Sequence, residues 1–171
     1  MCELPAKSGF SRRHFAGLAL GGLALVPLRG AFGASKQIEA LAVTCIDFRF
    51  ITRQVAYLDT NLRLTQNYDL VASAGASLAA VSEMFPASVT QFWNQVAIAR
   101  RFHAIKKIVF IDHMGCGAYG TEFNVPTPDD ERRRHMVVMR EAKALLQQKH
   151  HDLGSAFYLT EENGTINPVL I

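Results

Sequence analysis

The stretch Lys-Ile-Val-Phe-Ile-Asp at residues 107–112 decides the fold. Its four central residues are apolar and mostly β-branched, which predicts a strand buried on both faces of a sheet. Two further runs, residues 38–46 and 68–72, have the same character. Segments with apolar residues at helical spacing separate these runs. The sequence therefore predicts an α/β fold with a mainly parallel sheet between helices, a Rossmann-like arrangement of three layers.

Helices are predicted over residues 52–62, 88–102 and 130–149. In the last of these, the expected inward residues are Met136, Val137, Ala144 and Leu145. Residues 155–160 and 165–171 flank Asn163-Gly164. This dipeptide favours a two-residue type I′ turn, so a C-terminal β-hairpin is expected. No repeat or interdomain linker is visible, and residues 34–171 are expected to form one domain.

Residues 1–33 have the character of an export signal. Arg12 and Arg13 precede an apolar run over residues 15–28, which is too short to span a bilayer comfortably as a helix. Small residues follow at Ala31, Gly33 and Ala34. Paired arginines in this setting resemble a twin-arginine signal. This predicts a periplasmic protein, cleaved near residue 33 or 34, with no stable membrane span afterwards. An uncleaved N-terminal membrane anchor is the alternative.

The net positive charge of the chain belongs to this segment. The sequence has 18 Lys and Arg against 15 Asp and Glu, and residues 1–33 hold four of the basic and one of the acidic residues. Residues 34–171 therefore carry 14 of each. A formally neutral domain without a basic strip gives no argument for nucleic-acid binding.

Polar residues that follow two of the predicted strands form a candidate metal site. Cys45 ends the first strand, and His113 and Cys116 directly follow the third. Because the carboxyl ends of parallel strands meet at one edge of a sheet, these side chains are expected to converge. Two thiolates and an imidazole suit tetrahedral zinc, and three protein ligands leave a fourth position open, as in catalytic rather than structural sites.

Asp47 and Arg49 share the strand face of Cys45 if extended geometry continues through them. Arg49 is suited to hold the Asp47 carboxylate through a bidentate pair. Asp47 is then expected to orient a metal-bound water or to take the fourth position itself. The expected pocket lining is Ile46, Phe48, Gly75 and Gly117. Four histidines and one charged run are expected on the surface: His103, His135, His150, His151 and residues 129–134.

Two plainer interpretations remain open. Cys45 and Cys116 are the only cysteines of residues 34–171, and outside the cytoplasm two cysteines commonly form a disulfide. Asp47 and Arg49, taken alone, are typical of an ordinary ion pair at a strand end. Neither interpretation explains why His113 stands at ligand spacing from Cys116.

The motifs C-x-D-x-R at residues 45–49 and H-x-x-C-G at residues 113–117 together resemble those of the β-class carbonic anhydrases. The pair Ala74-Gly75 after the intermediate strand fits the same pattern, and the resemblance covers roughly residues 38–171. It implies reversible hydration of carbon dioxide to bicarbonate by zinc-bound hydroxide, in a homodimer or higher homo-oligomer. It also implies one zinc ion per chain on Cys45, His113 and Cys116, and a catalytic dyad of Asp47 and Arg49.

The sequence departs from that family at Ile46 and Phe48, where small polar residues are common. If these apolar side chains narrow the pocket, hydrolysis of a related small molecule, carbonyl sulfide or carbon disulfide, becomes an alternative on the same scaffold. A zinc-binding module without catalysis is a third hypothesis.

Overall fold

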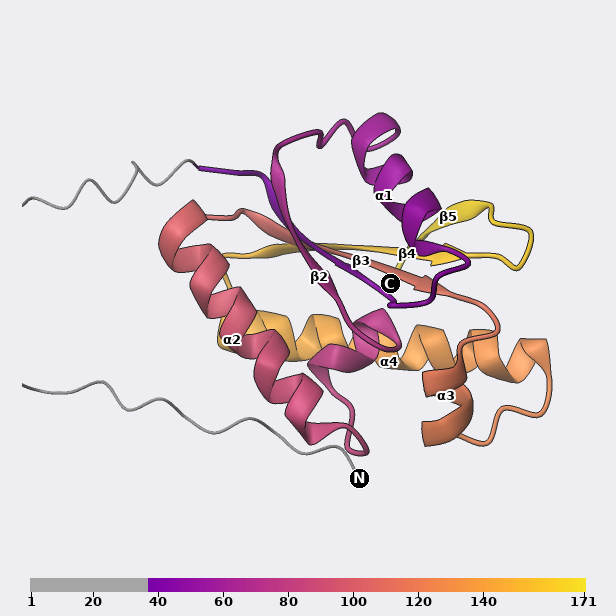
Figure 1. Ribbon diagram of the computed structural model, residues 1–171. Helices are drawn as coiled ribbons and strands as arrows, with labels where there is room; N and C mark the ends of the chain where they lie inside the picture. The colour runs from indigo at the N-terminus through magenta and orange to yellow at the C-terminus, as the bar shows by residue number, and fades with distance from the viewer. Residues whose placement is uncertain (1–36) are drawn as a thin grey trace, which may run out of the picture. The chain divides into compact units, whose positions relative to one another are not determined.

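A five-stranded sheet forms the centre of residues 37–171, the part of the chain that this computed structural model describes (Figure 1). The export signal predicted over residues 1–33 lies outside the described residues. The strand order is β2-β1-β3-β4-β5, and β5 alone is antiparallel to its neighbour. The strands are β1 (Ala40–Thr44), β2 (Tyr68–Ala72), β3 (Lys107–His113), β4 (Gly154–Thr160) and β5 (Ile166–Val169).

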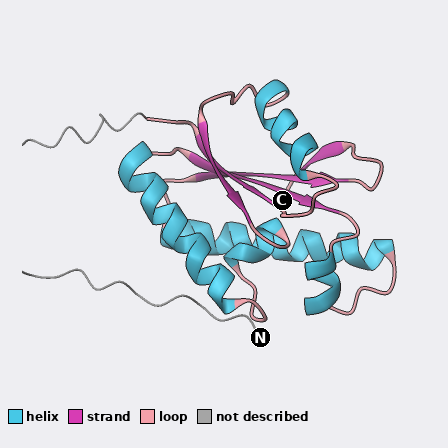
Figure 2. Ribbon diagram, in the orientation of Figure 1, coloured by secondary structure: helices cyan, strands magenta, loops and turns pink. Residues whose placement is uncertain are grey.

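Helices cover both faces of this sheet (Figure 2). Helix α1 (Ile51–Thr60) packs on one face, and α2 (Pro86–His103) and α4 (Pro128–Lys149) pack on the other. The 3₁₀ helix η1 (Ala76–Ala80) and the short α3 (Gly117–Glu122) lie on the side of α4. The predicted three-layer α/β fold is therefore confirmed. No helix in the described range 37–171 is long and apolar enough to cross a membrane.

Alternate residues of the central strands belong to two separate hydrophobic cores, one on each face of the sheet. Ala40 and Ala42 of β1 pack under Leu58 of α1, whereas Leu41 and Val43 face the helices of the other layer. All five residues of β1 are buried. This two-sided burial explains why the strands read as continuous apolar runs rather than alternating ones.

Helix α4 begins where the sequence supplies a cap. The Thr127 hydroxyl accepts a hydrogen bond from the Asp130 backbone N–H at 3.1 Å, and Pro128 occupies the first turn. Acidic residues in that turn also stabilise the helix, because they lie at the positive end of its dipole.

The predicted inward face of α4 is wrong. Met136 and Leu145 are only half-buried and Val137 and Ala144 are exposed. The buried stripe begins with two polar residues, which a search for apolar periodicity passes over. It consists of Glu131, His135, Val138, Met139, Ala142 and Leu146.

The hairpin between β4 and β5 exists, but its turn differs from the predicted one. The Gly164 N–H donates to the Glu161 carbonyl, and the Glu161 N–H donates to the Thr165 carbonyl, each at 2.8 Å. Within this connection only Gly164 has a positive φ, at +86°, whereas a type I′ turn requires a positive φ at Asn163 as well. The connection is therefore a five-residue loop, with glycine at the one left-handed position.

The direction of strand addition reverses at β1. The chain passes from β1 to β2 on one side and then returns to place β3 on the other. In parallel sheets the crevice outside the carboxyl ends of strands at such a switch point is where ligands bind. Cys45 follows β1 and His113 ends β3 at this crevice.

Candidate metal centre

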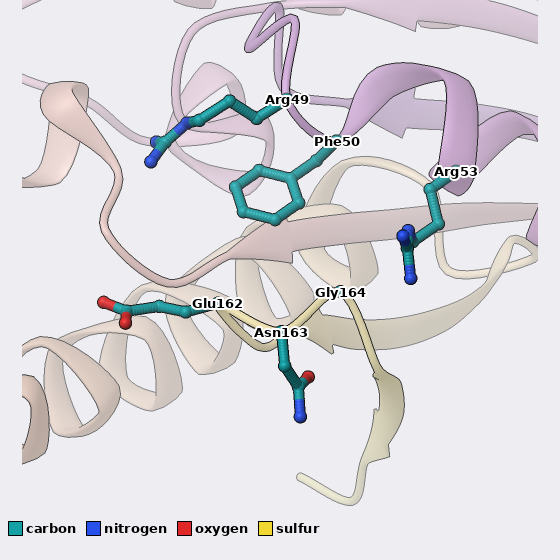
Figure 3. Close-up of a pocket in the computed structure, with 6 residues that line it drawn as sticks. All are labelled: Arg49, Phe50, Arg53, Glu162, Asn163 and Gly164. Carbon is teal, nitrogen blue, oxygen red and sulfur yellow. The ribbon is translucent and has the colours of Figure 1, made fainter.

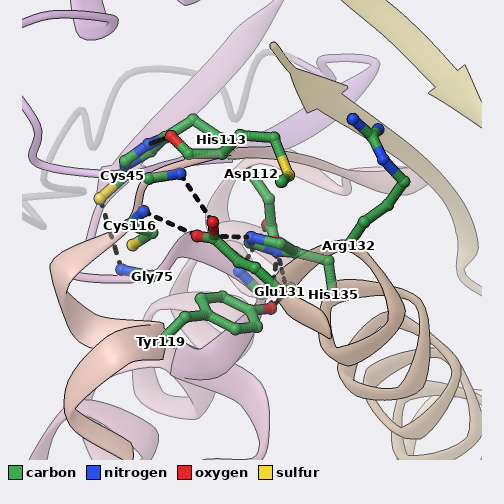
Figure 4. A network of polar contacts seen from close by, with 12 residues as sticks. Cys45, Gly75, Asp112, His113, Cys116, Tyr119, Glu131, Arg132 and His135 are labelled. Atoms are coloured by element: carbon green, nitrogen blue, oxygen red, sulfur yellow. Dashed lines mark hydrogen bonds and ion pairs between the residues drawn. The ribbon is translucent and has the colours of Figure 1, made fainter. Parts of the chain in front are cut away.

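Three side chains that are distant in the sequence converge at the switch point (Figure 4). The Sγ atoms of Cys45 and Cys116 and a ring nitrogen of His113 all lie within 4.8 Å of one another, and all three residues are buried. Both cysteines are free thiols, so the alternative disulfide is not formed. Sulfur and nitrogen donors in this arrangement fit a tetrahedral ion of the zinc type.

The orientation of His113 leaves one ring nitrogen free for such an ion. Its Nδ1 lies 2.9 Å from the Met114 carbonyl oxygen, which accepts hydrogen bonds but cannot donate them. Nδ1 therefore carries the proton, and the neutral ring presents the Nε2 lone pair. Nε2 is buried and has no hydrogen-bond partner. A backbone carbonyl that fixes the tautomer in this way is typical of metal-binding histidines.

The two thiols are electrostatically unequal. A hydrogen bond from Cys116 holds the pKa of Cys45 well below its ordinary value, and the same contact raises the pKa of Cys116. The Gly75 backbone N–H also donates to Cys45 Sγ at 3.4 Å. Burial lowers the pKa of His113, but the neighbouring Cys45 thiolate raises it, and the net shift is upward. Cys45 is therefore the more acidic of the two thiols.

Arg49 fixes the Asp47 carboxylate beside the ligands. Its Nε donates to Oδ1 at 3.0 Å and its Nη2 donates to Oδ2 at 2.7 Å. These bonds lower the pKa of Asp47 to about 2. The same Nη2 donates to the Gly115 carbonyl at 2.9 Å, so one guanidinium joins the first motif to the turn that carries Cys116.

Of the four residues expected to line the pocket, two are glycines in the segments around the ligands and two are exposed apolar side chains. Gly75 has a left-handed backbone, φ +74°, and a Cβ there would lie 2.5 Å from Leu78 Cδ1. Gly117 opens α3 with free space around it. Ile46 and Phe48 are 60% and 86% exposed in the single chain, so neither narrows a pocket by itself.

Phe50, which no sequence motif singled out, covers the imidazole of His113. Its buried ring lies 4.8 Å from the His113 ring. Phe50 also lines an open pocket of about 430 Å³ (Figure 3). The pocket is lined by Arg49, Phe50, Arg53, Glu162, Asn163 and Gly164.

His135 and Glu131 were expected on the surface, but both are buried. His135 is fully buried, and Glu131 is buried with its carboxylate against the backbone of Gly115 and Cys116. The spacing of four residues, which places both on one helix face, was the available signal. His103, by contrast, is partly exposed and pairs with Asp69 on β2 at 2.7 Å.

A family model and two relatives match most of the described chain. A family model described as putative carbonic anhydrase matches residues 35–169. An uncharacterized protein of Rickettsia bellii (strain RML369-C) is 29% identical over 136 residues, covering 78% of this chain and 82% of that protein. An uncharacterized protein of Rickettsia conorii (strain ATCC VR-613 / Malish 7) is also 29% identical, covering 78% of this chain and 73% of that protein.

Solved structures show the same fold at low identity. The β-carbonic anhydrase CafD of Aspergillus fumigatus superposes with a TM-score of 0.56 at 13% identity, covering 85% of this chain and 94% of that one. CafA of the same fungus gives 0.50 at 13% identity, covering 78% and 76%. With the family match spanning almost all of the described residues, the chain belongs to the putative carbonic anhydrase family and has the α/β fold of the β-carbonic anhydrases.

Proposed function

We propose that this chain is a zinc-dependent carbonic anhydrase that converts carbon dioxide reversibly to bicarbonate. The convergence of Cys45, His113 and Cys116 within 4.8 Å carries the proposal. Zinc bound to such a donor set with one open position lowers the pKa of a coordinated water toward about 7, which supplies the nucleophile at neutral pH. The chain's own residues orient this nucleophile and provide an apolar wall for carbon dioxide.

Asp47 is the residue that orients the nucleophile. With its pKa held at about 2, the carboxylate stays ionised at neutral pH and accepts hydrogen bonds only. Its Oδ2 lies 3.8 Å from His113 Nε2, within reach of a ligand in the fourth position. The bidentate pair with Arg49 holds the carboxylate in place, so that it would accept a hydrogen bond from solvent on the ion rather than bind the ion itself.

Phe50 keeps the His113 side of the site apolar. Its ring covers the imidazole, and both residues are buried. Exclusion of water strengthens the electrostatic contacts of the ligands. An apolar wall also suits carbon dioxide, which carries no charge to be recognised.

The second half of the proposal is a homodimer or higher homo-oligomer. Ile46 and Phe48 lie within the first motif, on either side of Asp47, and expose large apolar surface. Exposed apolar side chains clustered beside a functional site are typical of association surfaces. A second copy that covers these side chains would also close the pocket, and this is the role we assign to them.

We also propose that the protein is exported to the periplasm. The support is the sequence pattern of residues 1–33, with Arg12-Arg13 before a short apolar run and small residues after it. N-terminal sequencing of the protein from a periplasmic fraction tests this. A mature chain that begins near residue 34 is the expected result, and an intact N-terminus in the membrane fraction contradicts it.

The proposed reaction is tested by stopped-flow measurement of carbon dioxide hydration on protein of known zinc content. Acceleration that scales with bound zinc, and that disappears in His113→Ala, is the expected result. An inactive protein with full zinc would remove carbonic anhydrase activity. Release of sulfide from carbonyl sulfide or carbon disulfide would then favour the related hydrolase, and inertness to all three would favour a non-catalytic zinc module.

A further inference from the structure

We propose that Glu131, His135 and Asp112 are positioning residues that preform the metal site before the ion binds. These three buried side chains form a continuous contact chain behind the ligands (Figure 4). The inference depends on metal binding by the proposed site, but not on which reaction the bound ion serves.

Glu131 fixes the turn between two of the ligands. Its Oε2 accepts a hydrogen bond from the Gly115 N–H at 3.0 Å, and its Oε1 accepts one from the Cys116 N–H at 2.8 Å. Two consecutive peptide groups are thus held by one carboxylate. Gly115 has φ +67°, so the turn takes a shape that most residues avoid. The direction of the Cys116 side chain follows from this backbone.

His135 joins Glu131 to the strand that carries His113. Its Nδ1 lies 2.9 Å from Asp112 Oδ2, and its Nε2 lies 3.7 Å from Glu131 Oε1. The imidazole is fully buried between the two carboxylates. Buried carboxylates are costly unless they are paired, so each member of this chain depends on the others.

Asp112 connects the segments behind all three ligands. It immediately precedes His113, and its Oδ2 accepts from the hydroxyl of Tyr119, three residues after Cys116, at 2.8 Å. Its Oδ1 accepts from the Ser77 N–H at 3.0 Å. Ser77 follows the turn in which the Gly75 N–H donates to Cys45 Sγ. One buried carboxylate therefore ties together the segments that place the imidazole and both sulfurs.

A positioning role can be distinguished by measurement from general support of the fold. A group that only stabilises the core changes the free energy of unfolding but leaves the geometry around the ion unchanged. Residues that orient metal ligands typically change metal affinity by about 10- to 100-fold when replaced. Metal affinity and the ligand field of the bound ion are therefore the informative measurements.

The test compares Glu131→Gln with Glu141→Gln, which alters an exposed glutamate of the same helix. Glutamine keeps one acceptor oxygen but turns an N–H₂ group toward a backbone N–H. We expect zinc affinity, measured by chelator competition on the full-length protein, to fall about 10- to 100-fold in Glu131→Gln and to stay unchanged in Glu141→Gln. The thiolate-to-cobalt absorption of the Co²⁺-loaded protein is expected to shift in the first variant only.

A second variant, His135→Asn, covers the case in which Glu131→Gln does not fold. Its amide retains an N–H toward Asp112 and removes the partner of Glu131, so a smaller loss of affinity is expected. Wild-type affinity and an unchanged cobalt spectrum in the folded variants would overturn the inference, whatever their melting temperatures. A wild-type protein that binds no zinc would instead remove the proposed function together with it.

Discussion

Oδ2 of Asp47 lies 3.8 Å from Nε2 of His113. The carboxylate therefore stands beside the free imidazole nitrogen without forming a hydrogen bond to it. Its pair with Arg49 accounts for this placement, because both oxygens are already engaged by the guanidinium.

Replacement of Asp47 by Asn is expected to separate catalysis from metal binding. The amide keeps the shape of the side chain, but it pairs poorly with Arg49 and cannot remain a pure acceptor. We expect kcat/KM for carbon dioxide hydration to fall about 100- to 1000-fold while zinc content stays at the wild-type level. Stopped-flow assay and metal analysis of the same preparation check this, and unchanged activity would contradict the role assigned to Asp47.

Zinc binding is expected to release protons at neutral pH. In the metal-free pocket the pKa of Cys45 is lowered and that of Cys116 is raised, because the two thiols share a hydrogen bond. Binding therefore removes a proton from Cys116 and, where the pH is below the raised pKa of His113, a further proton from that imidazole. Zinc affinity should accordingly rise with pH.

Calorimetric titration with zinc in buffers of different ionisation enthalpy measures this release directly. His113→Ala provides the control, since it removes one of the titrating groups and should reduce both the affinity and the number of protons. Binding that releases no proton at pH 7 would show that both sulfurs are already thiolates in the free protein.

The centre of the sheet could be predicted from the sequence because β1 and β3 are buried on both faces. Residues 68–72 form β2 as expected, and β3 extends the expected strand by one residue, to His113. The ligands could be found for a related reason. In a parallel sheet, residues that directly follow strands gather at one edge, so strand ends alone bring Cys45 and His113 together.

The support behind the ligands could not be predicted in the same way. Glu131 and His135 lie in a strongly charged helix, and charged residues are seldom fully buried unless paired. Their partners come from β3 and the Gly115–Cys116 turn, which the sequence of the helix does not reveal. Helix η1 was missed because its five small or apolar residues have no helical periodicity, although all are buried.

Gly75→Ala is expected to destabilise the protein, whereas Gly117→Ala is expected to be tolerated. Alanine at position 75 would combine a left-handed backbone with a Cβ 2.5 Å from Leu78 Cδ1, whereas nothing lies within 4 Å of a Cβ at position 117. We expect a loss of about 1–3 kcal/mol in the free energy of unfolding for the first variant. Urea denaturation of the metal-free proteins measures the difference, and equal stabilities would contradict the strain argument.

The oligomer is expected to depend on Phe48. This side chain is 86% exposed in the single chain, and a charge placed in an association surface prevents its burial. We expect Phe48→Asp to be monomeric by sedimentation velocity and to keep its zinc. Leu170→Asp is the matched control, since Leu170 is 92% exposed but lies at the end of the chain beyond β5. If wild type and Phe48→Asp sediment alike, this surface does not form the interface.

Bound zinc is expected to protect the two cysteines from oxidation. Their sulfurs lie within 4.8 Å of each other as free thiols, and the hydrogen bond from Cys116 lowers the pKa of Cys45, which favours its reactive thiolate form. A mild disulfide oxidant should therefore join Cys45 to Cys116 in the metal-free protein, because a small movement brings the sulfurs to bonding distance. In the zinc-loaded protein both sulfurs are engaged by the ion, and the same treatment should leave two reactive thiols.

Thiol counts on denatured samples, with Cys116→Ser as the variant that cannot form this bond, measure the outcome. Equal oxidation rates with and without zinc would mean that the sulfurs do not bind the ion.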